Sequence, residues 1–210
     1  MKIAVFGASG KTGVLLVSQA LEQGFEVNAY VRRENALALQ HPNLKIILGS
    51  LTDEAKIKEA LRGVQACIST LGGNSLTKPA TEFTMGIKQI IQIAVEEKVN
   101  QFIYLSSIGA GESRFYMAQP IRFFVAGLFL KVPLADHTQN EDIIRSSSLN
   151  WTIIRPGGLT DGFKSDLLSH GSEKIKLKGN PQISRASVAS FMLQQVNKDA
   201  YSRKAVWLFE

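Results

Sequence analysis

The 210-residue chain has a single cysteine, Cys67, and only three histidines. One cysteine can form no intramolecular disulfide, and histidines at positions 41, 137 and 170 lack the spacing of a metal site. We therefore expect no metal centre, and a reducing compartment such as the cytoplasm. Long apolar runs are also missing, so we expect neither a signal peptide after Lys2 nor a membrane span.

Two catalytic motifs are absent as well. The chain has no Gly-x-Ser-x-Gly nucleophile elbow. No lysine stands four residues after any of the four tyrosines, so the Tyr-x-x-x-Lys pair of mainstream short-chain dehydrogenases is missing. In that pair the tyrosine is the acid and the lysine lowers its pKa. Alcohol oxidation and sugar epimerisation by this route are therefore not expected.

Positive charge is in excess but is not concentrated. The net charge is +6 and the isoelectric point is about 9.5. The basic residues are scattered, apart from the pair Arg32-Arg33 and three alternating lysines within residues 174–178. No aromatic ladder or helix-turn-helix pattern accompanies them, so nucleic acid is not an expected partner. The alternation at 174–178 predicts an edge strand with a solvated face.

The most informative segment is a glycine-rich turn near the start of the chain. Residues 2–6 form an apolar run typical of a buried parallel strand, and residues 12–23 carry apolar positions at helical spacing. Gly7, Gly10 and Gly13 stand between or at the edge of these elements. At such a turn a dinucleotide pyrophosphate rests on backbone N–H groups. We expect Gly7 to form the tight turn, Gly10 to admit the phosphates and Gly13 to let the helix approach the strand.

A nucleotide P-loop is the alternative, because Gly10-Lys11-Thr12 reads as Gly-Lys-Thr. That motif needs a further glycine where Val5 stands. Ala8 stands at the first glycine position of the usual fingerprint G-x-G-x-x-G, so the pattern here is G-x-x-G-x-x-G. The position of these glycines between a strand and a helix favours the dinucleotide interpretation.

The second strand, residues 26–31, ends in Arg32 and Arg33. NAD-selective folds place an acidic residue near this point to bind the ribose 2′-hydroxyl. Guanidinium groups suit a 2′-phosphate instead, so the sequence predicts a preference for NADP. Glu34 is expected to begin the next element. The alternative is that both arginines are solvated loop charges.

Strands and helices alternate along the chain, which predicts an α/β, doubly wound, mainly parallel Rossmann-type sheet in one domain over residues 1–210. Residues 157–210 are expected to form a small C-terminal substrate-side lobe. The expected strands are 2–6, 26–31, 44–48, 65–70, 101–105, 151–155, 174–178 and 204–208, and the expected helices are 12–23, 53–61, 81–97, 134–147 and 185–197.

In such sheets ligands bind at the carboxyl ends of the strands. Beyond the glycine turn this rule selects Ser50-Leu51, the small residues 70–74, Ser106-Ser107 and residues 155–159. The apolar stretch 120–134 fits either an amphipathic helix packed on the domain, or a lid or subunit contact.

Together these pieces resemble the atypical short-chain dehydrogenase/reductase group, in its NmrA-like branch, which includes biliverdin-IXβ (flavin) reductase. The motifs that carry the resemblance are Ala4–Gly13, Val31-Arg32, Thr70–Gly72, Leu105–Ser107 and Trp151–Gly157. The resemblance implies a cofactor site for NADP (NADPH), with Ser107 beside the nicotinamide and substrate. The positions implied to hold the cofactor are Gly7, Ser9, Gly10, Lys11, Thr12, Gly13, Arg32, Arg33, Ser50, Leu51, Leu71, Gly72, Ser107, Pro156, Gly158 and Leu159.

The chain departs from that family at several positions. Ser50 replaces an aspartate, Ala36 replaces an arginine whose place Arg33 is expected to take, and Gly158 replaces a histidine. His137 aligns with a family histidine and is either functional or a solvated residue at the start of a helix. The nearby carboxylates of Asp136, Glu141 and Asp142 are interpreted as solvated.

The first functional hypothesis is an NADPH-dependent reductase that transfers hydride directly to a flavin, bilin or quinone-like acceptor. Such conjugated acceptors need positioning more than acid catalysis. Ser107 would orient substrate or nicotinamide, or would only bond to backbone. The second hypothesis is a non-catalytic NADP-binding sensor. A small aromatic or conjugated partner and a monomer or homodimer are expected.

Overall fold

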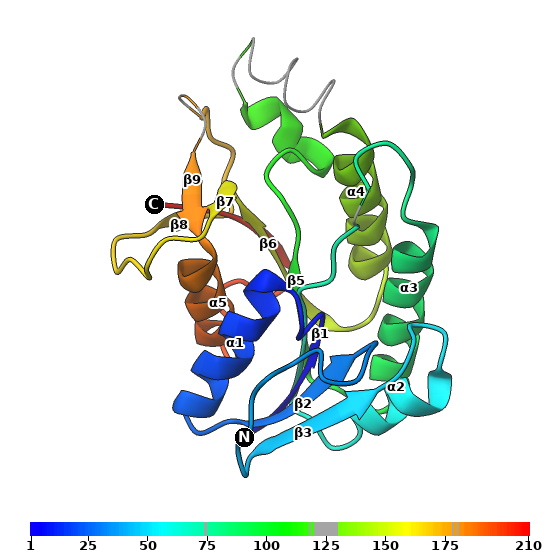
Figure 1. Cartoon of the computed structure of the whole chain (residues 1–210). Helices are drawn as coiled ribbons and strands as arrows, with labels where there is room; N and C mark the ends of the chain where they lie inside the picture. The colour runs from blue at the N-terminus through cyan, green and yellow to red at the C-terminus, as the bar shows by residue number, and fades with distance from the viewer. Residues whose placement is uncertain (74, 118, 120–129, 178, 180) are drawn as a thin grey trace.

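The computed structural model describes every residue except 74, 118, 120–129, 178 and 180. A central eight-stranded sheet has the order β3-β2-β1-β4-β5-β6-β10-β8, and only β8 runs antiparallel to its neighbour (Figure 1). The strands are β1 (Lys2–Phe6), β2 (Glu26–Val31), β3 (Leu44–Leu48), β4 (Ala66–Ser69), β5 (Gln101–Leu105), β6 (Asn150–Pro156), β8 (Ser169–Gly171) and β10 (Lys204–Phe209). A separate pair joins β7 (Gly158–Thr160) to β9 (Gln182–Ser184). The predicted doubly wound, mainly parallel sheet is confirmed.

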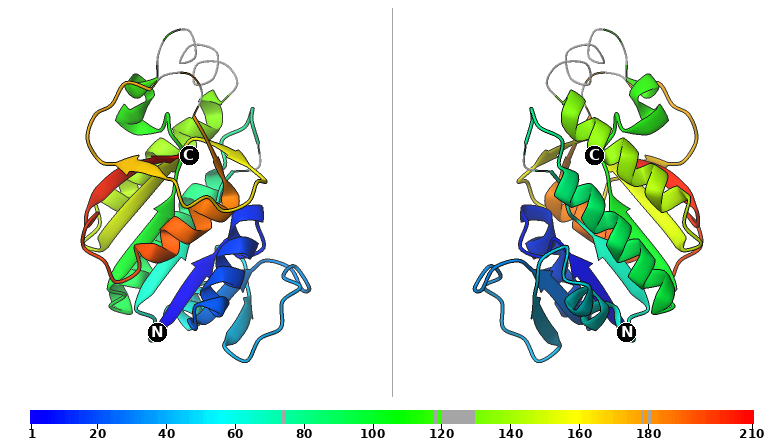
Figure 2. Two further views of the ribbon diagram at one scale, coloured as in Figure 1. Left: turned by 90° about the vertical axis from the view of Figure 1, so that its left-hand side faces the viewer. Right: turned by 90° about the vertical axis from the view of Figure 1, so that its right-hand side faces the viewer.

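Helices cover both faces of the sheet, as the two views of Figure 2 show. They are α1 (Lys11–Glu22), α2 (Glu54–Leu61), α3 (Thr81–Glu96), α4 (Lys131–Arg145) and α5 (Arg185–Gln194), with a short 3-10 helix η1 (Gly111–Tyr116). Alternate residues of β1 serve the two faces: Ile3 and Val5 pack into the core under α1 and α5, whereas Ala4 and Phe6 pack under α2 and α3. Burial on both faces explains why β1 reads as a continuous apolar run.

The strand order reverses between β1 and β4, because β2 and β3 lie to one side of β1 and β5 and β6 lie beyond β4. A crevice forms at the carboxyl ends of the strands at such a switch point. Gly7 follows β1 and Thr70 follows β4, so the two loops meet there. The Thr70 hydroxyl donates to the carbonyl oxygen of Gly7 at 3.1 Å and ties the loops together.

The strands and helices of the first 156 residues lie within about three residues of their predicted bounds. The predicted edge strand at 174–178 is wrong for residues 174–177, and Lys178 lies outside the described residues. The edge position is taken by β8 instead. Leu177 turns away from the sheet, and its N–H bonds to the carbonyl oxygen of Tyr116 at 2.8 Å. Exposed Lys174 and Lys176 alternate with the partly buried Ile175 and the buried Leu177, a pattern that resembles an edge strand.

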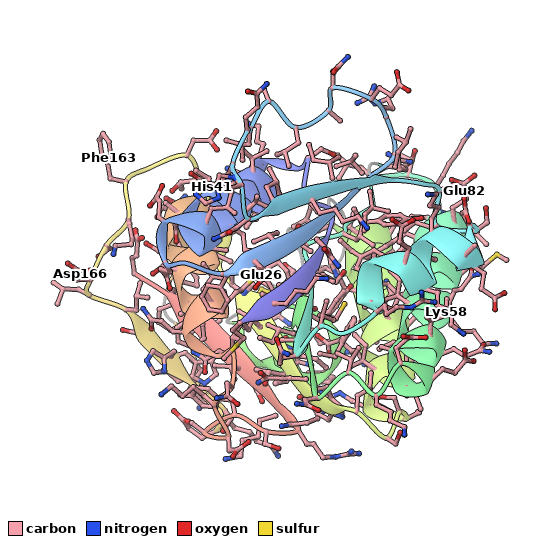
Figure 3. All side chains as sticks on the ribbon, turned by 90° about the horizontal axis from the view of Figure 1, so that it is seen from below. Glu26, His41, Lys58, Glu82, Phe163 and Asp166 are labelled. Atoms are coloured by element: carbon pink, nitrogen blue, oxygen red, sulfur yellow. The ribbon has the colours of Figure 1, made fainter. Side chains whose placement is uncertain are left out.

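The C-terminal third carries the elements that sequence periodicity missed, namely β7, β8 and β9, each three residues long. Between β7 and β8 a loop projects beside α1 and α5, with Phe163 and Asp166 pointing outward (Figure 3). The Phe163 side chain is 98% exposed. Most of the apolar stretch 120–134 lies outside the described residues, and its last residues belong to α4. None of the described helices is long and apolar enough to cross a membrane.

Candidate functional site

The glycine turn is built by two steric constraints. Gly7 has φ of +82°, a left-handed conformation that favours glycine, and a Cβ there would lie 2.8 Å from Thr70 Oγ1. A Cβ on Gly13 would overlap the carbonyl oxygen of Gly7. Helix α1 can therefore begin directly against the end of β1. These local roles are the ones expected of Gly7 and Gly13.

The N-terminus of α1 is open to an anionic ligand. Its N-cap residue is Gly10, no side chain caps the helix, and its first turn holds no acidic residue. The first N–H groups of a helix lack intrahelical partners and carry partial positive charge. A cofactor pyrophosphate would satisfy them without displacing a protein group.

One cavity, of about 770 Å³, opens beside the end of β2 and is here called the adenosine-side cavity. Arg32, Arg33 and Lys78 contribute cationic side chains to its lining, and Glu82 is the one carboxylate among its lining residues. Glu34 is absent from that lining and is exposed. The donor set fits a ribose that carries a 2′-phosphate better than one that carries a free 2′-hydroxyl.

A second cavity, of about 530 Å³, is here called the nicotinamide-side cavity. It shares Gly10 and residues 70–72 with the adenosine-side cavity. Apolar side chains including Leu105, Ile108 and Met117 line it together with the polar Ser107 and His137. Because the two cavities meet at the glycine turn, one extended ligand can occupy both.

The structure brings most of the predicted cofactor residues to these cavities. Those that line one or both are Gly7, Ser9, Gly10, Lys11, Thr12, Arg32, Arg33, Leu51, Leu71, Gly72, Ser107, Pro156, Gly158 and Leu159. Gly13 and Ser50 do not. Gly13 packs behind the turn, and the Ser50 hydroxyl bonds to that of Thr52 at 2.8 Å.

Ser107 follows β5 and is the predicted orienting residue. Its hydroxyl donates to the carbonyl oxygen of Ile108 at 3.2 Å, a long hydrogen bond. A ligand can replace such a weak local partner at little cost. Ser107 therefore makes the backbone bond of one interpretation and also lines the nicotinamide-side cavity, and its orienting role stays a prediction.

The interpretation of His137 as a solvated residue at the start of a helix is wrong. Helix α4 begins at Lys131, which places His137 inside the helix. The hydroxyl of Tyr104, on β5, lies 2.7 Å from His137 Nδ1. Burial lowers the pKa of His137, and the charges of Glu141 and Asp136 oppose this only in part. Sequence reasoning missed Tyr104 because it tested the tyrosines only for a lysine four residues later.

The interpretation of Asp136 and Glu141 as solvated carboxylates is also wrong. Glu141 is 1% exposed, and its Oε1 accepts hydrogen bonds from Arg155 Nε at 2.9 Å and from Ser106 Oγ at 2.6 Å. Asp136 accepts from the N–H of Ala80 at 3.1 Å. Asp142 is exposed, as expected. These contacts fix α4 against the ends of β5 and β6, where the nicotinamide-side cavity lies.

Arg155 also binds Glu112, whose Oε1 accepts from its Nη1 at 2.8 Å. This hydrogen bond is the main cause that lowers the pKa of Glu112 from 4.5 to about 2. Arg155 itself is buried, and its pKa is raised by the two carboxylates although burial opposes it. The guanidinium thus joins η1, α4 and β6 below the cavity.

Arg185, which sequence reasoning did not select, lies at the start of α5 and lines the nicotinamide-side cavity. Its Nη1 lies 2.6 Å from Asp161 Oδ1, and Lys11 Nζ lies 3.1 Å from Asp161 Oδ2. Asp161 therefore holds two cations beside the cavity. In the sequence, Arg185 is only a basic residue at the start of a predicted helix. Nothing in that local pattern indicates that this end of the helix lies beside the glycine turn.

Comparisons with known proteins place these features in a family. A sequence profile described as NAD(P)H-binding matches residues 7–199. An uncharacterized chloroplast protein of Arabidopsis thaliana is 29% identical over 98% of this chain and 75% of its own length. The photosystem II assembly factor Ycf39 of Cyanophora paradoxa is 25% identical over 96% of this chain. This chain spans 62% of the length of that relative.

Solved structures share the fold at lower identity. The anaerobilin reductase ChuY of Escherichia coli superimposes with a TM-score of 0.82 at 22% identity, over all of this chain and 97% of its own. A short-chain dehydrogenase/reductase of Veillonella parvula, solved in complex with NADP, gives 0.85 at 16% identity over all of this chain and 94% of its own. The profile match covers the glycine turn and both cavities, which favours dinucleotide binding over the P-loop alternative. The chain has a Rossmann-like fold and belongs to the NAD(P)H-binding family.

Proposed function

We propose that the chain is an NADPH-dependent reductase that transfers hydride directly to a flavin, bilin or quinone-like acceptor. The observation that carries the proposal is the pair of joined cavities. The first is lined by three cationic side chains, two of them directly after β2, and by one carboxylate, that of Glu82. The second is lined by apolar side chains together with polar groups that include Ser107 and His137. In this proposal residues 157–210 form the substrate-side part of one domain.

The cofactor assignment rests on the chain's own residues. Gly7, Gly10 and the uncapped start of α1 would hold the pyrophosphate, and Arg32 with Arg33 would hold the 2′-phosphate. Lys78, which the sequence reasoning did not select, adds a third cation to the same cavity. The Veillonella parvula structure, which contains NADP, shares this fold.

Bound NADPH would supply a hydride at the nicotinamide side of the turn. The protein would contribute position: Leu105, Ile108 and Met117 offer apolar surface against which a conjugated ring can lie, and Ser107 would orient it. Apolar walls also exclude water from the reacting carbon. An acceptor of this kind needs no Tyr-Lys pair, which agrees with the sequence.

The proposal is tested by mixing the protein with NADPH and FMN, biliverdin or a simple quinone, and following the loss of reduced nicotinamide by absorbance. We expect turnover with at least one acceptor and a much lower rate with NADH. Ser107→Ala should lower kcat, since this side chain would orient the acceptor or the nicotinamide.

The sensor hypothesis predicts a different outcome. Tight NADPH binding without turnover of any acceptor would contradict the reductase and support a non-catalytic NADP-binding protein. The nicotinamide-side cavity of about 530 Å³ favours the reductase, because it leaves room for a second ring beside the cofactor. A location in the cytoplasm stays a prediction, since the Arabidopsis thaliana relative is named as a chloroplast protein.

A further inference from the structure

Tyr104 and His137 form a hydrogen-bonded pair, and the neighbouring groups indicate which of the two donates the proton. The tyrosine oxygen lies 2.7 Å from His137 Nδ1, a short hydrogen bond, and no acceptor for the phenol proton other than Nδ1 is recorded among the residues that the structure describes. Asn140 Nδ2 lies 3.4 Å from the same oxygen and can only donate to it. The phenol proton is therefore directed to Nδ1. A neutral imidazole that accepts at Nδ1 carries its own proton on Nε2.

The other ring nitrogen remains available to a ligand. His137 lines the nicotinamide-side cavity with Ser107, and Nε2 has no hydrogen-bond partner among the residues that the structure describes. Tyr104 is fully buried on the central strand β5, so it cannot follow a moving imidazole. The buried Glu141–Arg155 pair fixes the helix that carries His137. The imidazole is thus held at one edge while its free N–H borders the cavity.

Burial keeps the ring uncharged near neutral pH, against the opposing effect of two nearby carboxylates. Helix α4 contributes Asp136 and Glu141, which are bound to the Ala80 N–H and to Arg155. Strand β5 contributes Tyr104, and burial raises the pKa of its hydroxyl. Helix α3 contributes Phe83, whose ring lies edge-to-face with that of His137 at 5.9 Å between the two centroids. The largest influence on His137 is its own burial, which lowers its pKa.

We infer that Tyr104 is a positioning residue that holds His137 as the Nε2–H tautomer, so that His137 donates a hydrogen bond to the hydride acceptor. The inference rests on the proposed reductase function and extends it. Hydride transfer moves one hydrogen and two electrons from the nicotinamide to the acceptor, which gains one negative charge. His137 would stabilise that charge without giving up its proton, and water would then supply the proton. The preferred acceptor has a carbonyl or imine nitrogen conjugated to the atom that receives the hydride.

The tautomer can be measured without turnover. In ¹⁵N-histidine-labelled protein we expect His137 to be neutral and protonated on Nε2, and to lose this fixed state in Tyr104→Phe. The chain offers a matched control, because Tyr201 and His170 form a second pair at 2.7 Å that is exposed. Tyr201→Phe should alter the His170 signals and leave those of His137 unchanged. A cationic His137 at neutral pH, or an Nδ1–H tautomer, would overturn the inference.

Kinetics tests the catalytic consequence. With FMN as acceptor, His137→Phe should lower kcat at least about tenfold, since one hydrogen-bond donor to a developing charge is lost. His137→Gln, which keeps an N–H donor, should recover part of the loss. Tyr104→Phe should lower kcat about threefold or more when His137 is present. The same substitution should have no effect on kcat in a protein that already carries His137→Phe, because Tyr104 acts only through its hydrogen bond to His137. The Kd for NADPH should stay unchanged in each variant, which shows that the cofactor site still folds.

The two proposals can fail separately. If His137→Phe reduces FMN as fast as the wild type, the role of the pair is refuted and the reductase stands. If the wild-type protein binds NADPH and reduces no acceptor, the reductase is refuted, and the role assigned to His137 falls with it.

Discussion

At the scale of single residues, Gly13 shows how the glycine turn constrains the sequence. Gly13→Ala places a methyl group against the Gly7 carbonyl, so we expect the free energy of unfolding to fall by about 2 kcal/mol. Gly162→Ala is the matched control, because its Cβ would meet ordinary contacts at 3.6 Å. Denaturant titration of both variants measures the difference. Equal stabilities would show that the turn can relax.

The same scale shows where sequence reasoning stops. The spacing of Gly7, Gly10 and Gly13 predicts their positions because a local turn determines them. Glu141 and Asp142 are adjacent carboxylates, and only Glu141 is buried. The difference depends on Arg155, which lies on another element 14 residues away. A local pattern contains no information about that partner.

At the scale of elements, Asp161 links the start of α1 to the start of α5 through Lys11 and Arg185. Asp161→Asn frees both cations for the cofactor phosphates, so we expect the Kd for NADPH to fall about two- to threefold at low salt. The effect is small because Lys11 and Asp161 are largely exposed, and it should vanish at high salt.

The control for Asp161 is Asp166→Asn, which removes a carboxylate of the same loop that is 94% exposed and lies 3.8 Å from Lys164 Nζ. Its affinity for NADPH should equal that of the wild type. Weaker binding in Asp161→Asn would contradict the account, because it would give Asp161 a role in holding the cofactor.

Glu141 joins α4 to β6 in the same way, but in a buried setting. Glu141→Gln leaves the Arg155 charge only partly compensated, so we expect the free energy of unfolding to fall by about 3 kcal/mol. Asp142→Asn, one residue away and exposed, should change it little. Thermal or denaturant unfolding compares the two, and similar losses would contradict a specific role for the buried pair.

Element boundaries followed from the sequence where one face of an element packs against the sheet. The apolar spacing of residues 12–23 and 81–97 anticipates α1 and α3 because both helices bury one side. The three-residue strands β7, β8 and β9 are too short to show a period. Residues 174–177 show a period without forming a strand, and Leu177 makes only an isolated bridge to Met117, outside the central sheet.

At the scale of the whole molecule, the free energy of unfolding at low pH depends on carboxylates that are hydrogen-bonded to arginine in the folded state. The pKa of Glu112 is about 2 in the folded state against an ordinary 4.5, so folding favours its charged form. Its contribution is present above pH 4.5 and is lost as the pH falls from 4.5 towards 2. The free energy of unfolding of Glu112→Gln should therefore depend less on pH in this window. An identical slope would contradict the assignment.

The alternation of strands and helices predicts the doubly wound sheet, because right-handed crossovers leave few other arrangements. That arrangement alone locates the cleft at the ends of the strands and most of the residues predicted to line it. It cannot supply the contacts across the cleft, such as Arg185 with Asp161 or Tyr104 with His137, because these join residues 24 and 33 positions apart.

The proposed function depends most directly on NADPH binding in the cleft through the arginines that follow β2. The most direct measurement is the Kd of the wild-type protein and of Arg32→Gln for NADPH and NADH, with Arg62→Gln, an exposed arginine at the end of α2, as control. We predict that the wild type and Arg62→Gln bind NADPH at least about tenfold more tightly than NADH, and that Arg32→Gln loses most of this difference. Equal affinity of the wild type for NADPH and NADH would contradict the account.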